Sequence, residues 1–173
     1  VAAAICAIAL QSETSDVASV TACLQLMQRL LSSFPHTSSV VQARAKLLYT
    51  LLHAYDMSIA TSCANILRHC ITEYSWADLD IDVDSQSLYY LLQRNTVIKL
   101  LMLLYVKHLV HTTSNKLESL LCSENYAILQ CLWKMLNASC DMSEAALGIF
   151  ASVSVHNYVR SFIFKFGGID KVL

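Results

Sequence analysis

Histidine and cysteine have the widest chemical range in this sequence, because both side chains can bind metal and take part in catalysis. The chain contains six His and seven Cys. A zinc site across two adjacent helices would use four of them, which are His53, Cys63, His69 and Cys70. No two cysteines have Cys-x-x-Cys spacing, and no Glu follows His108 in a His-Glu-x-x-His pattern. We therefore expect buried thiols beside surface histidines, and we predict no bound metal.

The sequence lacks the short motifs that mark common enzyme active sites. It contains no Gly-x-Gly-x-x-Gly, no Gly-x-Ser-x-Gly and no phosphate-binding loop. Scattered Ser, His and Asp residues form a catalytic group only where the fold brings them together. We predict a protein that is not an enzyme and has no cofactor. A helical enzyme, or a metal or small-molecule binder, is the less favoured alternative and would use the four His and Cys residues above.

An acidic segment interrupts the chain near its middle, where four Asp residues alternate with apolar residues over 78–84. A calcium loop of the helix-loop-helix type needs a Gly at its sixth position and a Glu at its twelfth. Counted from Asp80, these positions are Ser85 and Leu91. The segment therefore fails as a calcium loop.

Two interpretations of the acidic segment remain. Residues 75–84 form the longest stretch without a helical pattern, which favours a solvated acidic connector between two halves of the chain. The alternative is a docking strand for a basic partner. In that case Asp80 and Asp82 would contact the partner, and Trp76 and Ile81 would be its apolar anchors.

Trp133 and Asn137 form the third candidate site. They are four residues apart, so both would project from one face of a helix. A Trp in a helical pattern is usually part of the core, but here it could also line a groove for a partner.

The composition limits the elements that can position these side chains. Three Gly and one Pro are too few for the frequent turns of a β-sandwich or barrel, so we predict an all-α fold. Apolar residues make up 55% of the chain and charged residues 14%, which indicates helices covered on more than one side. A net charge of −1 without basic clusters argues against direct binding of nucleic acid.

The compartment follows from the cysteines and the apolar runs. An odd number of cysteines, spread through apolar helices, indicates free thiols in a reducing compartment, so we expect an intracellular protein. The longest apolar run, residues 97–110, is interrupted by charge and is shorter than the ~20 residues of a membrane span. We predict no membrane partner.

Apolar periodicity and capping residues predict a succession of helices. One begins after Asp16 and ends at Phe34, and another begins after Asp56. A long helical pattern bends near Arg94-Asn95, and a polar joint at His156-Asn157 separates the last two complete helices. The remaining expected helices cover 1–11, 40–55, 114–122 and the stretch from the Ser123 cap to 136.

Two stretches near the C-terminal end share a family pattern. Residues 128–137 read Ile-Leu-Gln-Cys-Leu-Trp-Lys-Met-Leu-Asn. A polar joint and a glycine turn follow, with Asn157, Arg160, Ile163, Gly167, Gly168, Ile169 and Leu173 in that order. These stretches cover roughly the last quarter of the chain and resemble armadillo repeats. The tripeptide Asp-Met-Ser recurs at 56–58 and 141–143, close to twice the ~42-residue period of armadillo and HEAT repeats.

The resemblance implies an armadillo/HEAT-like α-solenoid, a superhelical stack of helical hairpins. We expect residues 1–173 to form one such domain, with the acidic loop at 75–84 between its halves, as a fragment of a longer array. In peptide-binding armadillo proteins an Asn bonds the peptide backbone and a Trp packs on its side chains, which implies these roles for Asn137 and Trp133, with Gln130 beside them. Gly148 and Ser152 at the next equivalent positions break the Trp/Asn ladder, so recognition of basic import signals is not expected.

The function expected from these patterns is a protein-interaction scaffold that binds a partner peptide or helix. A helical module that only multimerises through its apolar surplus is the alternative.

Overall fold

The computed structural model describes residues 16–34, 41–73, 75–112, 114–138 and 140–166. Within these ranges the regular secondary structure is helical and includes no strand, which confirms the all-α prediction. The helix expected over 1–11 and the Gly-Gly turn lie outside the described residues. Contacts divide the chain into two compact units, Val1–Asp82 and Val83–Leu173, with the boundary inside the acidic segment.

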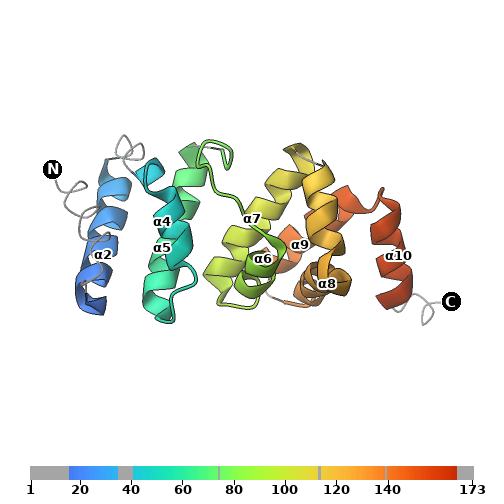
Figure 1. Ribbon diagram of the computed structural model, residues 1–173. Helices are drawn as coiled ribbons and strands as arrows, with labels where there is room; N and C mark the ends of the chain where they lie inside the picture. The colour runs from blue at the N-terminus through green and yellow to red at the C-terminus, as the bar shows by residue number, and fades with distance from the viewer. Residues whose placement is uncertain (1–15, 35–40, 74, 113, 139, 167–173) are drawn as a thin grey trace. The chain divides into compact units, whose positions relative to one another are not determined.

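Figure 1 shows the helices of both units. The first unit contains α2 (Val17–Ser33), α4 (Ala45–Leu51) and α5 (Met57–Glu73). The second contains α6 (Ser85–Leu91), α7 (Thr96–Thr112), α8 (Ser114–Met135), α9 (Cys140–Val153) and α10 (Asn157–Phe166).

In the first unit α5 packs against both α2 and α4. Asp16 is the N-cap of α2, where its carboxylate accepts a hydrogen bond from the Ser19 N–H at 2.6 Å. Asp56 does the same for α5, accepting from the Ser58 and Ile59 N–H groups at 2.8 and 3.1 Å. Both caps confirm the predicted helix starts, and α2 ends at Phe34 as expected.

The helix expected over 40–55 is shorter than predicted. A turn at 43–44 precedes α4, and the residues after Leu51 form successive three-residue hydrogen-bonded turns, such as His53 N–H to the Thr50 carbonyl at 3.1 Å. The apolar side chains at Val41 and Leu52, on either side of α4, are nonetheless buried. Tight turns keep residues three apart on one side, so the apolar spacing survives where the regular helix does not.

In the second unit, α6, α7 and α8 each pack against the next helix in sequence and against the one after it. α6 packs against α8 and α8 against α10, while α7 packs against α9. Contacts of α7 with α6 and α8, and of α8 with α9, join these two rows. The seven buried side chains of α7 are Ile98, Leu101, Met102, Leu103, Tyr105, Val106 and Leu109. Because α7 is covered on several sides, its apolar run is a core helix.

The predicted bend near Arg94-Asn95 is a break between α6 and α7. Asp84 caps α6 by accepting from the Ser87 N–H at 2.8 Å, and Asn95 accepts from the Ile98 N–H at 3.0 Å at the start of α7. The polar joint predicted at His156-Asn157 also separates two helices, because α10 begins at Asn157.

α8 was expected as two helices, with the second capped by Ser123. Instead it is one element whose backbone takes a left-handed conformation at Asn125 (φ 57°) and Tyr126 (φ 64°). Ser123 donates its hydroxyl to the Leu120 carbonyl at 2.7 Å, a partner that precedes it in the chain. Two left-handed residues interrupt a right-handed helix. A joint therefore exists close to Ser123, where the prediction placed it, but Asn125 and Tyr126 form it.

Candidate functional site

Trp133 lies half-buried in an aromatic cluster of the second unit. Its ring meets Phe150 edge-on, with ring centroids 5.5 Å apart and an interplanar angle of 86°. The Phe162 ring lies at 6.2 Å, also edge-on. Edge-to-face contacts of this kind stabilise a packed core. The position of Trp133 is therefore largely structural, with one part of the side chain still accessible.

Asn137 and Trp133 do not share a helix face as the four-residue spacing predicted. α8 ends at Met135, and Asn137 lies in the following turn, where its N–H donates to the Lys134 carbonyl at 3.4 Å. The Asn137 side chain is exposed. Gln130 uses its amide within α8, donating Nε2–H to the Asn125 carbonyl at 3.1 Å and supporting the left-handed joint.

The acidic segment presents carboxylates and buries its apolar side chains. Trp76 is 3% exposed and Ile81 8% exposed, whereas Asp80 and Asp82 are exposed. An apolar anchor must be accessible to a partner, and neither Trp76 nor Ile81 is accessible in this structure.

Two carboxylates of this segment, those of Asp78 and Asp80, have partners within the first unit. Asp80, in a left-handed conformation (φ 50°), pairs with Lys46 at 2.5 Å. Asp78 accepts from the Ser75 hydroxyl and backbone N–H at 2.7 and 2.9 Å, and these bonds lower the Asp78 pKa. Gln42 donates to the Asp78 carbonyl at 2.9 Å. The segment is thus bonded to residues just before and within α4, which favours the connector interpretation.

The four His and Cys candidates form no metal site in the structure. Among the described residues no group of three His, Cys, Asp or Glu side chains is placed to bind a metal ion. Cys63 and Cys70 are buried, and burial raises their pKa to about 12 and about 11. Thiols with such pKa values are protonated and unreactive at neutral pH.

A pocket that the sequence patterns did not reveal lies in the second unit. It has a volume of about 370 Å³ and is walled by α6, α7, α8, α9 and the turns that follow α6 and α8. Its lining consists of Tyr89, Leu92, Gln93, Lys99, Cys131, Lys134, Met135, Ala138 and Met142. We call this site the lysine pocket.

The lining of the lysine pocket combines buried apolar side chains, which we call its floor, with the two lysines Lys99 and Lys134. The buried lining residues are Leu92, Met135 and Met142. Lys99 is half-buried and Lys134 is exposed, and neither pairs with a carboxylate among the described side chains.

The pKa of the Cys131 thiol depends on both lysines of this pocket. Burial raises the pKa of its thiol, and the ammonium groups of Lys134 and Lys99 oppose the rise. Cys122, on the same helix, has the opposite neighbour: burial raises its pKa, and the Glu118 carboxylate raises it further. The charged neighbours of the two thiols therefore have opposite sign.

The signal for the lysine pocket was present in the sequence but ambiguous. Lys99 interrupts the apolar run at 97–110, and Lys134 lies inside the 128–137 motif. Each is an ordinary solvated lysine when considered alone. Only the packing of α7 against α8 brings both to one pocket.

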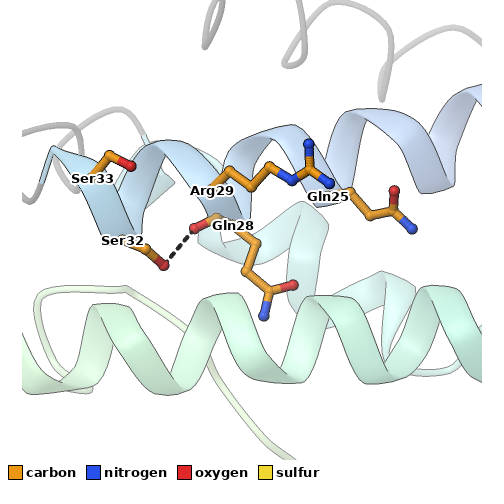
Figure 2. Close-up of a pocket in the computed structure, with 5 residues that line it drawn as sticks. All are labelled: Gln25, Gln28, Arg29, Ser32 and Ser33. Atoms are coloured by element: carbon orange, nitrogen blue, oxygen red, sulfur yellow. Dashed lines mark hydrogen bonds between the residues drawn. The ribbon is translucent and has the colours of Figure 1, made fainter.

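A second hollow, in the first unit, is wholly polar in its described lining. Figure 2 shows its five side chains along α2, with the Ser32 hydroxyl donating to the Gln28 carbonyl at 2.9 Å. They are Gln25, Gln28, Arg29, Ser32 and Ser33. All five are exposed and come from α2, and the described lining includes no apolar residue.

No protein-family model, curated protein or solved structure matches this chain. In the described part of the chain, each helix is too short or too polar to cross a membrane.

Proposed function

We propose that this chain is a non-enzymatic, intracellular protein-interaction module that binds a peptide or helix of a partner, within an armadillo- or HEAT-like array. The observation that carries this proposal is the lysine pocket, because a concave site with an apolar floor and a few polar groups is the usual form of a binding site. Asn137 is exposed next to Ala138, which lines the pocket, so a bound segment would extend across this end of α8.

The packing order within the second unit supports the repeat arrangement. Stacked helical repeats place each helix against its counterpart in the next repeat as well as against its own partner. The contacts of α6 with α8 and of α7 with α9 have this form, and those of α6 with α7 and of α8 with α9 pair the helices within a repeat. The α8–α10 contact would begin the next repeat.

Site-specific photo-crosslinking tests the binding function. Asn137 suits the crosslinker because it is exposed, whereas a change at Trp133 would disturb its packing on Phe150. The matched control places the same crosslinker at Gln28, exposed on α2 of the other unit. We expect discrete adducts with cellular proteins when the crosslinker is at position 137. None of these adducts should form when it is at position 28. Identical adduct patterns at both positions would reject this surface as the binding site.

A structural module that self-associates is the second candidate, and exposed apolar side chains of the second unit favour it. Leu147, Val155 and Phe164 are each more than half exposed. Self-association through them predicts a mass that rises with concentration in sedimentation experiments and stays monomeric in the Leu147→Asp/Phe164→Asp variant. A monomer at all concentrations would rule this candidate out.

A further inference from the structure

The lysine pocket combines two features that together specify a ligand chemistry. Its positive charge comes from two α-helices, Lys99 in the first turn of α7 and Lys134 in the last turn of α8. Neither ammonium group has a carboxylate partner among the described side chains. Two ammonium groups that line one pocket without a carboxylate partner favour the binding of an anion there.

The floor adds a requirement that an inorganic anion does not meet. The floor residues Leu92, Met135 and Met142 line the pocket with only a small part of each side chain accessible. Methionine side chains adapt their shape to different apolar groups and are common at surfaces that bind several related peptides. A ligand that fits both features has a carboxylate beside an aliphatic side chain.

We propose that the lysine pocket binds an acidic segment of a partner protein, with a Glu or Asp carboxylate between Lys99 and Lys134 and a Leu- or Met-sized side chain on the apolar floor. This inference rests on the proposed protein-binding function and specifies its partner. Gln93, exposed at the pocket wall, has an amide that can donate to or accept from the backbone of the bound segment.

Other occupants fit these observations less well. Nucleic acid binding needs phosphate contacts repeated along a strand, and two lysines on a chain of net charge −1 provide too few. The acidic segment of a second copy is also a poor occupant, because its apolar side chains Trp76 and Ile81 are buried.

The charge of the pocket can be measured without any partner, through alkylation of Cys131. The probes are iodoacetate, which is an anion, and iodoacetamide, which is neutral. Both react with the thiolate, which displaces iodide to form a thioether, so the ratio of their rate constants cancels the thiolate fraction. Two nearby ammonium groups should raise this ratio about threefold to tenfold over a free cysteine at low salt. The excess should vanish near 1 M salt, where the Debye length falls to about 3 Å.

Cys122 is the internal control for this measurement, because it lies on the same helix but beside Glu118. Chymotryptic cleavage after Tyr126 separates the two thiols for mass spectrometry without depending on lysine. We expect an iodoacetate-to-iodoacetamide ratio below that of free cysteine at Cys122. Equal ratios at Cys122 and Cys131 would overturn the charge assignment.

The ligand class is tested by selecting from a phage-displayed library of random peptides on the intact chain. We expect enriched peptides to combine Glu or Asp with Leu or Met, and to lose at least tenfold in affinity for the Lys99→Gln/Lys134→Gln variant. The control variant Lys107→Gln/Lys165→Gln removes two exposed lysines from α7 and α10 and should bind as wild type. Circular dichroism confirms that both variants are folded.

The outcomes separate the two proposals. Enriched peptides that lack acidic residues, or that bind the Lys99→Gln/Lys134→Gln variant as well as wild type, would overturn the acidic-segment inference and leave the protein-binding function standing. A selection that enriches no peptide at all would contradict both.

Discussion

Phe162 is the side chain on which the attachment of α10 to the second unit depends. It is 1% exposed, and its ring packs against Trp133, Phe150 and Phe166, with ring centroids between 5.2 and 6.4 Å apart. The only other buried residue of α10 is Val159. Replacing Phe162 by Ala removes this cluster contact and leaves a cavity.

The expected cost of Phe162→Ala is about 3–5 kcal/mol, because the side chain is fully buried in a packed aromatic cluster. Burial of the Val159 side chain is worth only about 1.5–3 kcal/mol. An isolated helix shorter than ~12–15 residues is marginal in water. The ten residues of α10 should therefore open locally, before the rest of the unit unfolds.

Hydrogen exchange measured by mass spectrometry tests this opening. A loss of about 3–5 kcal/mol corresponds to at least a hundredfold faster exchange of the α10 amides. The matched control is Phe164→Ala, the same chemical change two residues away at a side chain that is 69% exposed. Ala is the better helix former by a few tenths of a kcal/mol, so the control should leave α10 protection equal or slightly higher. Similar exchange in the two variants would show that Phe162 does not dock α10.

Three further predictions test local features of the structure. Asp84→Ala should destabilise the chain by about 1 kcal/mol through loss of the α6 cap. Hydrogen bonds from Ser87 lower the Asp84 pKa, so the stability that this carboxylate contributes at pH 7 should vanish as the pH falls through the lowered pKa. Melting curves of wild type and variant from pH 7 to 2 can follow this loss. Tyr158→Phe should leave the melting temperature unchanged or raise it, because the buried hydroxyl has no hydrogen-bond partner among the described residues. Burial raises the Tyr158 pKa to about 12, so wild type should lose stability relative to this variant as the pH rises above about 10. A variant that melts lower than wild type at pH 7 would show that the hydroxyl does have a hydrogen-bond partner. At Asp80, whose φ is 50°, the Gly variant should be more stable than the Ala variant, whereas at Asp82 the Ala variant should be the more stable one. Denaturant unfolding of these four variants measures the difference. Greater stability of the Ala variant at both positions would contradict a left-handed conformation at Asp80.

Helix starts were the part of the fold that the sequence predicted best. The caps at Asp16 and Asp56 depend on a carboxylate and backbone N–H groups two or three residues away, so a short stretch of sequence contains the whole interaction. The break near Asn95 is also local, because its side chain caps the next helix.

Helix ends and joints were predicted less well, since weaker local preferences decide them. No Gly or Pro marks the end of α8 at Met135, and the shared helix face assumed for Trp133 and Asn137 was wrong for this reason. The joint inside α8 was expected near Ser123, a common capping residue, but Asn125 and Tyr126 take the left-handed conformation. Asn is among the residues that adopt this conformation most readily, whereas Tyr is not.

The structure also distinguishes two groups of charges, which are the Asp residues clustered over 78–84 and the two lysines of the lysine pocket. The acidic residues have local partners: Asp78 accepts from Ser75, and Asp80 pairs with Lys46. The charge of Asp80 is paired with a lysine of α4, and Asp78 accepts hydrogen bonds from neutral donors of the same segment. Lys99 and Lys134 come from different helices and have no described carboxylate partner, although both line one pocket. A binding site is better indicated by charge that the fold concentrates and leaves unpaired than by charge density along the chain. The acidic segment is the more conspicuous feature of the sequence, but the lysine pocket is the stronger candidate for function.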